Sequence, residues 1–149
     1  MNGSSAVETW NQLAPTTSPS VRYQSAMAYY PITKELIMFG GYNGINYLND
    51  TWSWNGNIWN QLLAQTIHPS NRQGAALSLS STGNYIIFGG YDGSTYYNDT
   101  WIYNNNTWEL IIPNGITGSP PVSQYPRMVY DSKVTNNILL LISNSITLT

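Results

Sequence analysis

The sequence predicts an all-β protein made of repeated sheets, each with four antiparallel strands. A pattern recurs every 49 residues along a chain of 149 residues. Each repeat holds short apolar runs separated by glycine, asparagine and proline turns. No long stretch shows the apolar period of a helix, roughly 3.6 residues. The length suits one domain, and we expect it to span residues 1–149.

Tryptophan spacing and two recurring blocks define the repeat. Trp10, Trp59 and Trp108 are each 49 residues apart. The chain therefore contains two full units, residues 22–62 and 72–111, and a degenerate third, residues 121–149. Two blocks recur at the same interval: Phe39-Gly40-Gly41-Tyr42 matches Phe88-Gly89-Gly90-Tyr91, and Asn49-Asp50-Thr51-Trp52 matches Asn98-Asp99-Thr100-Trp101.

Each full unit divides into four short strands. The second strand of each is a continuous apolar run, which is typical of a strand covered on both faces. Asn55-Gly56-Asn57 indicates a tight hairpin, because Asn-Gly readily supplies positive φ. The expected strands are Ser25–Tyr30, Leu36–Phe39, Asp50–Trp54 and Ile58–Leu62 in the first unit, and Ala75–Leu79, Tyr85–Phe88, Asp99–Tyr103 and Thr107–Ile111 in the second.

The third unit is less regular. Ile142-Ser143 stands where the double glycine should be. Residues 9–13 match residues 58–62, the outer fourth strand of the first unit, so we expect residues 9–13 to complete the last unit as its outer strand. The other strands expected in this unit are Met128–Tyr130, Ile138–Ile142 and Ser145–Thr149.

Composition excludes several classes of function. Charged residues are 8% of the chain, the net charge is −2 and the isoelectric point is near 5.0, which argues against a nucleic-acid binder. The chain has no cysteine, and its single histidine, His68, cannot form a histidine cluster. The longest apolar run is far shorter than the roughly 20 residues of a membrane span. We therefore expect no cofactor, no metal, no nucleic acid and no membrane insertion.

A strand ending in Gly-Gly, an aromatic third strand and a Trp seven residues later occur twice. With these features the sequence resembles the Kelch-repeat family over about residues 8–149. Arg22 and Arg72 also fit the family pattern, whereas Arg127 lies too close to Tyr130 to be a third such arginine. The motif residues are Gly40, Gly41, Trp52 and Trp59 in the first unit, and Gly89, Gly90, Trp101 and Trp108 in the second.

Physical roles fit this motif. The double glycine suits positive φ and close backbone approach. Trp59 and Trp108 are large apolar plates that suit the gap between neighbouring sheets. Asp50 and Asp99 precede the third strand, and we expect their carboxylates to accept N–H bonds from the backbone or a Trp, or to pair with arginine.

The resemblance implies a β-propeller, a ring of about four to eight four-stranded blades. The chain has material for about three blades, which cannot easily close a ring alone. We therefore expect half of a six-bladed ring, completed by a homodimer. The competing interpretation is a fragment of a longer propeller.

The resemblance also implies a binding face lined by loops. These are the loops between the second and third strands, and the blade-to-blade segments 14–22, 63–72 and 113–127. Tyrosine rings beside hydrogen-bonding groups suit a peptide or a sugar, but they could instead pack the loops onto the blades. The candidate residues are Tyr42, Asn43, Asn46, Tyr47, Tyr91, Asp92, Thr95 and Tyr96.

Two interpretations stay open for the arginines. By resemblance, Arg22 and Arg72 face the channel mouth and bind acidic partners bidentately. Alternatively, each forms an ion pair between blades with Asp50 or Asp99. We interpret His68 as a loop residue rather than a ligand or base.

The sequence thus favours a non-catalytic interaction module that presents a loop-lined face to a protein or peptide. A carbohydrate-binding propeller of a cell-surface or secreted protein is the alternative. An enzyme whose site forms only in the assembled ring is a third hypothesis.

Overall fold

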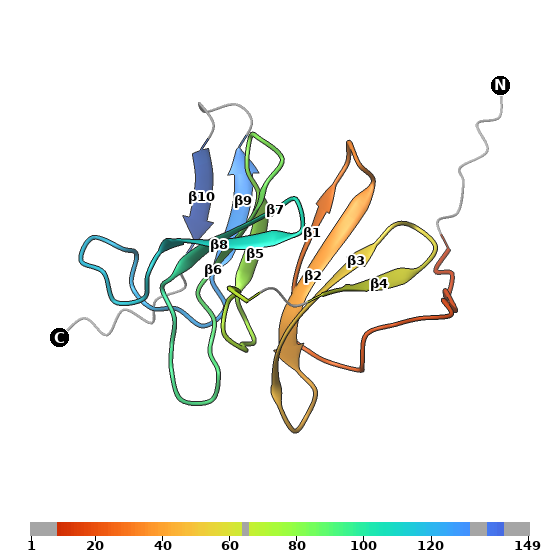
Figure 1. Cartoon of the computed structure of the whole chain (residues 1–149), viewed down its shortest axis with the longest axis horizontal. Coiled ribbons are helices and arrows are strands. Elements are labelled where there is room, and N and C mark those ends of the chain that lie inside the picture. The colour runs from red at the N-terminus through yellow and green to blue at the C-terminus, as the bar shows by residue number, and fades with distance from the viewer. Residues whose placement is uncertain (1–8, 64–65, 132–136, 142–149) are drawn as a thin grey trace.

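The computed structural model describes residues 9–63, 66–131 and 137–141, whose regular structure is entirely β (Figure 1). It forms two four-stranded antiparallel sheets, with strands in chain order, and a two-stranded sheet 3. The prediction of an all-β chain with four-stranded antiparallel sheets is confirmed. Sheet 1 holds β1 (Ala26–Tyr30), β2 (Glu35–Tyr42), β3 (Tyr47–Trp54) and β4 (Trp59–Leu62); sheet 2 holds β5 (Ala76–Leu79), β6 (Tyr85–Phe88), β7 (Thr100–Asn104) and β8 (Thr107–Ile112); sheet 3 holds β9 (Arg127–Asp131) and β10 (Asn137–Leu141).

The structure extends two strands of sheet 1 beyond their expected ends. β2 continues through Gly40 and Gly41 to Tyr42, and β3 begins at Tyr47 rather than Asp50. The ladder stays paired because a register shift between Phe39 and Gly41 lets the glycines bulge. This extension carries Tyr42 and Tyr47 to the two ends of one short connection.

The hairpin between β3 and β4 has the expected chemistry. Gly56 has a φ of 101°, which a residue with a Cβ rarely adopts. The side-chain Oδ1 of Asn55 accepts hydrogen bonds from the backbone N–H groups of Asn57 and Ile58, at 3.0 and 3.1 Å. The turn therefore supplies its own partners for these amides.

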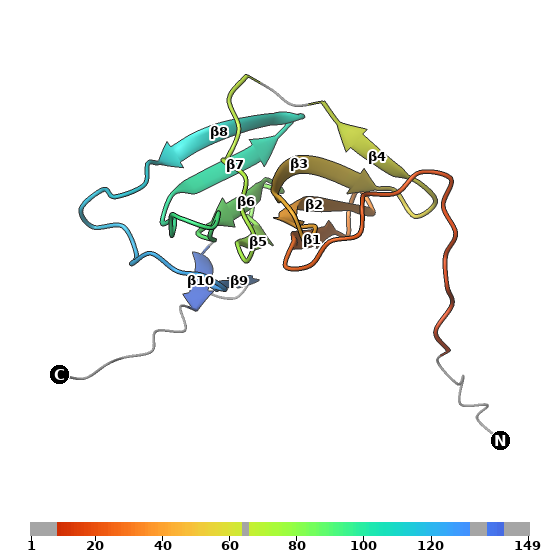
Figure 2. The ribbon, with the colours of Figure 1, turned by 90° about the horizontal axis from the view of Figure 1, so that it is seen from below.

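The sheets lie side by side with their first strands innermost (Figure 2). β1 contacts β5, and β5 contacts β9. Apolar side chains from facing surfaces of sheets 1 and 2 form the main core. Its buried members are Ala26, Ile37 and Phe39 from sheet 1, and Leu77, Tyr85, Ile87, Trp101, Tyr103 and Trp108 from sheet 2.

Trp108 occupies the gap between sheets 1 and 2. Its ring meets Phe39 edge-on with 5.2 Å between ring centroids, and its indole N–H donates to Thr51 Oγ1 at 3.1 Å. Only 6% of Trp108 is exposed. The interpretation of Trp108 as a plate between sheets is confirmed. Trp59, at the equivalent place on β4, instead packs on Trp54 and is half-buried.

Residues 9–13, expected to be an outer strand, form no strand here, and Trp10 is fully exposed. In Figures 1 and 2 this segment lies at the end of the molecule opposite sheet 3. The expected strand at Ser145–Thr149 and the Ile142-Ser143 position lie outside the described residues. Within the described ranges, no helix is long and apolar enough to cross a membrane.

Candidate functional site

The double glycines join neighbouring sheets through the backbone. Gly41 N–H donates to Arg72 C=O at 2.9 Å, and Gly90 N–H donates to Ser123 C=O at 2.9 Å. A Cβ on Gly40 would lie 2.6 Å from Arg72 O, and one on Gly89 would lie 2.9 Å from Ser123 O. All four glycines have positive φ. The expected roles in backbone turning and close approach are therefore both met.

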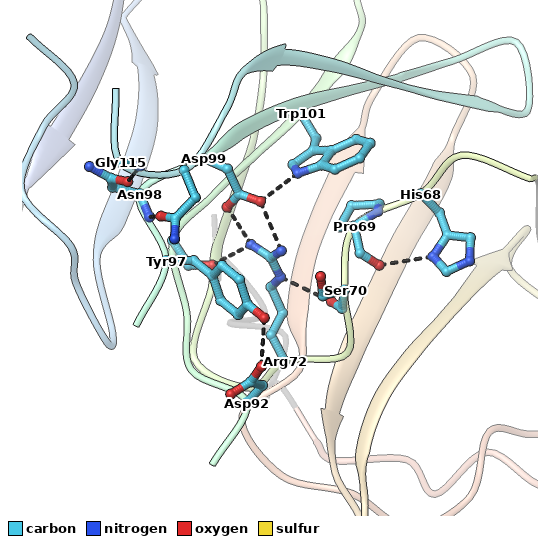
Figure 3. Close-up of polar contacts among 12 residues, drawn as sticks. His68, Pro69, Ser70, Arg72, Asp92, Tyr97, Asn98, Asp99, Trp101 and Gly115 are labelled. Carbon is cyan, nitrogen blue, oxygen red and sulfur yellow. Dashed lines mark hydrogen bonds and ion pairs between the residues drawn. The ribbon is translucent and has the colours of Figure 1, made fainter. Parts of the chain in front are cut away.

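Each arginine of the motif is held by an aspartate of its own repeat unit. Arg72 donates to Asp99 Oδ1 at 2.6 Å and Oδ2 at 2.9 Å, and also to Gly89 C=O at 3.0 Å (Figure 3). Arg22 repeats the arrangement with Asp50, at 2.5 and 2.9 Å, and with Gly40 C=O at 3.1 Å.

The structure therefore favours the ion-pair interpretation and corrects one detail of it. Each pair lies within one unit rather than between blades, because the strand after the double glycine brings its aspartate back beside the arginine. The Arg72 side chain is completely buried, and that of Arg22 is 5% exposed. Neither guanidinium is free to bind an acidic ligand from solution.

The aspartates also accept the indole N–H groups of the third strands. Trp101 Nε1 donates to Asp99 at 2.7 Å, and Trp52 Nε1 donates to Asp50 at 2.6 Å. Burial by itself would raise the pKa of Asp50, but hydrogen bonds from Arg22 and Trp52 outweigh it and lower that pKa. Both expected roles of the aspartates, pairing with arginine and accepting a Trp N–H, are met.

The third unit has a serine where the others have arginine. Ser123 N–H donates to Tyr97 C=O as Arg72 N–H donates to Leu48 C=O, so Ser123 is the equivalent of Arg72. Arg127 instead begins β9 and is exposed. The prediction that Arg127 is not the motif arginine is therefore confirmed.

Five tyrosines from the two full units form a continuous row of ring contacts, which we call the tyrosine row. Neighbouring ring centroids are 4.4 to 6.0 Å apart. The two end rings, Tyr23 and Tyr96, are 53% and 46% exposed. The β2–β3 and β6–β7 connections that carry most of the row extend in the same direction in Figure 1. In order, the row is Tyr23, Tyr42, Tyr47, Tyr91 and Tyr96.

Hydrogen bonds hold the row in place. Tyr42 and Tyr91 each donate a hydroxyl to a glycine carbonyl two residues on, Gly44 and Gly93. Gly93 also leaves room for its neighbour, because a Cβ there would lie 2.7 Å from the Tyr47 ring. The ring positions are therefore set before any ligand arrives.

The remaining candidates at the loop tips mainly stabilise their own turns. Asn43 Oδ1 accepts the N–H groups of Ile45 and Asn46, and Asp92 Oδ1 accepts those of Ser94 and Thr95. Such caps are a common use of Asn and Asp in turns. Asn46 is exposed and Thr95 is half-buried.

Asp92 has a second partner in Tyr97, whose hydroxyl donates to Asp92 Oδ2 at 2.5 Å. Burial acts to raise the pKa of Asp92, but bonds from Tyr97, Thr95 and Ser94 lower it to about 2. The Tyr97 ring also lies beneath the Arg72 guanidinium, 4.0 Å from ring centroid to Cζ. Tyr97 thus connects the loop tip to the buried ion pair.

Sequence reasoning missed Tyr23 and Tyr97. Tyr23 was hidden because the repeat places Gln73 at the equivalent position, with a matching bridge to Tyr91. Tyr97 was hidden because Leu48 is its equivalent in the first unit. Their positions directly after Arg22 and directly before Asn98-Asp99 were the available signals.

His68 lies away from the tyrosine row. Its Nδ1 is 2.9 Å from Pro69 O and 3.5 Å from Asn49 Nδ2. It lines a cavity of about 150 Å³ between sheets 1 and 2, beside Asp50 and Trp108. Within residues 9–63, 66–131 and 137–141, no group of three or more His, Asp or Glu is placed to hold a metal ion.

Comparison with known proteins gives one family. The family model described as the KLHDC2/KLHL20/DRC7 Kelch-repeats domain matches residues 4–142. Among curated proteins, none matches this sequence. The family match covers both full units, the ion pairs and the whole tyrosine row.

Proposed function

Because this chain belongs to the Kelch-repeat family, whose repeats generally mediate protein–protein interaction, we propose that it is a non-catalytic binding module that presents the tyrosine row to a protein or peptide partner. The observation that carries the proposal is the continuous contact of five tyrosine rings across two sheets. The row extends over both full units, so a partner could contact it along several residues.

The chemistry of the row suits a peptide. Tyrosine offers a rigid apolar ring and a hydroxyl at small entropic cost, which favours it at protein interfaces. The hydroxyl bonds of Tyr42 and Tyr91 fix these rings in advance, so binding need not order them. Because Arg22 and Arg72 are already paired, the face attracts a partner through rings and hydrogen bonds rather than through free positive charge.

Selection from a library of random linear peptides displayed on phage tests the proposal. We expect selected peptides to bind the chain and to lose at least about tenfold in affinity on Tyr96→Ala, because the substitution removes a large, exposed aromatic contact surface. Tyr91→Phe should retain most binding, because it keeps the ring. Ile32→Ala, which trims a 78% exposed side chain of the β1–β2 turn, is the control.

Failure to select any peptide, or peptides whose binding ignores Tyr96→Ala, would contradict this assignment of the binding face. Tyr96 is 46% exposed, so its truncation leaves the fold intact and a loss of binding reports on the surface itself.

A carbohydrate ligand is the second candidate, and one contact favours it. Tyr91 and Tyr96 stack with 4.4 Å between centroids and 27° between planes, and the exposed amide of Asn46 lies in the equivalent loop of sheet 1. Stacked rings beside amides suit the apolar face and hydroxyls of a sugar. A glycan array distinguishes the candidates: specific sugar binding that is lost on Tyr47→Ala and Tyr96→Ala would favour carbohydrate.

The proposal includes a second copy of the chain. Two copies, each contributing three units, would complete a six-bladed ring with a tyrosine row on each half. Light scattering on a size-exclusion column tests this, because the ring has twice the chain mass of 16.7 kDa. A monomer at every concentration would reject it.

A further inference from the structure

One chain of backbone hydrogen bonds runs through the inner ends of the three sheets. Gly74 N–H donates to Gln24 C=O at 2.8 Å, and Tyr125 N–H donates to Gly74 C=O at 2.8 Å. All three residues have φ near 60°, between 59° and 67°. They are therefore equivalent positions of the three units, and each of the two hydrogen bonds joins one sheet to the next in the same geometry.

The two ends of this bond chain are complementary. No described residue stands before Gln24 to accept its N–H, or after Tyr125 to donate to its C=O. The N–H of Gln24 and the C=O of Tyr125 are the two groups that one more hydrogen bond of this kind would join.

The exposed fractions of side chains on the outer faces of sheets 1 and 3 also indicate that each face lacks a neighbouring sheet among the described residues. Met27 and Leu77 are equivalent residues of β1 and β5, yet Met27 is 54% exposed and Leu77 is 8% exposed. Leu77 is covered by sheet 1, whereas no described sheet covers Met27. On β9, Val129 is 52% exposed at the place where Ala28 of β1 packs on the core.

In the same scheme, residues 9–13 correspond to the outer strand of the third unit, of which the structure describes β9 and β10. They match residues 58–62, the sequence of β4, and Trp10 is equivalent to Trp108. Trp108 of sheet 2 packs on Phe39 and donates to Thr51 of the preceding sheet. For a strand added to sheet 3, the preceding sheet is sheet 2, and the equivalent contacts are Phe88 and Thr100.

Within one chain these partners do not meet. Residues 9–13 lie beyond sheet 1, far from sheet 3, and Trp10 is 103% exposed (Figure 2). Residues 14–25 join the segment to β1, and Thr17 Oγ1 in this connection donates to the C=O of Trp59 on β4 at 2.5 Å, so the segment leaves beside sheet 1, whose open face carries Trp59. Whatever sheet covers that face therefore receives the segment.

We propose that residues 9–13 of one chain add in trans to sheet 3 of a second copy, with Trp10 packing on the second copy's sheet 2 where its indole N–H donates to Thr100. The same junction joins Gln24 N–H of the first chain to Tyr125 C=O of the second, and covers Met27 with the face of Val129. Two such junctions, related by a two-fold axis, close the ring. This inference rests on the two-copy ring of the proposed function.

The first test measures the mass of the particle in solution as a function of protein concentration. We expect a dimer whose dissociation constant rises at least about 30-fold on Trp10→Ala, because the substitution removes one anchor from each of the two junctions. Ile32→Ala, an equally simple removal of an exposed apolar side chain, should leave the constant unchanged. A dimer that is indifferent to Trp10→Ala would overturn the inference, as would a wild-type monomer throughout.

The absence of cysteine allows a direct test of the trans arrangement. Chains with Trp10→Cys are mixed with chains with Thr100→Cys at a protein concentration above the dissociation constant that the loss of Trp10 raises, and a short bismaleimide is added. We expect a covalent species of twice the chain mass, which neither variant forms alone. A doubly substituted chain that cross-links only within itself, with no mixed species, would show a strand added in cis and reject the inference.

The two proposals fail separately. Loss of peptide binding on Tyr96→Ala with an unchanged dimer mass would support the tyrosine row as the binding face and leave the junction between chains unaffected. Loss of the dimer on Trp10→Ala with retained peptide binding concerns the junction alone, because the row lies within one chain.

Discussion

Arg22 and Arg72 occupy equivalent positions of the repeat and have equivalent partners, Asp50 and Asp99, but differ in burial. Arg72 and Asp99 have side chains 0% and 7% exposed, whereas Arg22 and Asp50 are 5% and 21% exposed. Breaking a buried pair leaves an uncompensated charge away from water, and the penalty falls as water reaches the remaining group. The equivalent substitutions should therefore have unequal costs.

We expect Arg72→Ala to lower the free energy of unfolding by about 3–5 kcal/mol. Arg22→Ala should cost less, because water can solvate the Asp50 carboxylate that remains. Urea unfolding of both variants measures the difference. Equal costs, or a larger cost for Arg22→Ala, would contradict this account of the ion pairs.

Asp92 should make stability depend on pH in an acidic window. Its pKa in the folded chain is about 2, below the unfolded value of roughly 3.9. A lowered pKa gives stability that is fully present above the unfolded pKa and is lost as pH falls towards the folded pKa. Wild type should therefore exceed Asp92→Asn in stability most clearly near pH 6, and the gap should shrink between about pH 4 and pH 2.

Urea unfolding of both proteins across this range checks the prediction. The other carboxylates, including Asp50, titrate in both proteins and cancel in the difference. Asn43 already caps the equivalent loop with an amide, so Asp92→Asn preserves the turn. A gap independent of pH would show that the carboxylate charge has no part in it.

At the scale of the strand ends, the double glycine links one sheet to the next. Gly40→Ala would place a Cβ 2.6 Å from Arg72 O and displace the bond from Gly41 N–H. Gly44 has a φ of 95° but nothing within 4 Å of its added Cβ. The loss of stability on Gly44→Ala therefore reports only the strain of placing alanine at a positive φ.

We expect Gly40→Ala to destabilise the chain more than Gly44→Ala, although the φ of 63° at Gly40 is the easier one for alanine. Backbone strain of this kind costs roughly 1–3 kcal/mol, and the displaced contact adds to it at Gly40. Thermal unfolding of both variants compares them. A smaller loss for Gly40→Ala would remove the close approach as the reason for the glycine.

The strands were largely predictable from sequence because the repeat fixes them twice. All eight strands of the two full units overlap their expected ranges, and Asn55-Gly56 forms its hairpin. The pairing of Arg72 with Asp99 was one of two interpretations that the sequence left open, and the sequence did not show that the pair stays within one unit, since that depends on where the chain returns after the double glycine. Contact among the tyrosine rings depends on two sheets being side by side, which spacing does not encode.

Residues 9–13 show the opposite case. Their sequence matches β4, but a strand forms only where an edge offers hydrogen-bond partners. In one chain the matching edge is at the far end of the molecule. The local sequence therefore identified residues 9–13 as a potential strand, but whether this strand forms depends on where a free sheet edge lies in the assembled molecule.

At the scale of the whole molecule, equivalent tryptophans report on assembly. Trp108 is 6% exposed between sheets 1 and 2, whereas Trp59 is half-buried on the open face of sheet 1. Trp108→Ala should cost about 3–5 kcal/mol at any protein concentration, because its neighbours belong to the same chain. Trp59→Ala should cost little in the monomer and considerably more in a ring that covers it.

We therefore expect the cost of Trp59→Ala to grow with protein concentration while that of Trp108→Ala stays constant. Association stabilises only the folded state that binds, so each rise in concentration adds more stability to the wild type than to a variant that associates more weakly. Chemical unfolding at two concentrations, one below and one above the dimer dissociation constant, measures both costs. A cost of Trp59→Ala that is the same at both concentrations would mean that the open face of sheet 1 stays uncovered when chains associate.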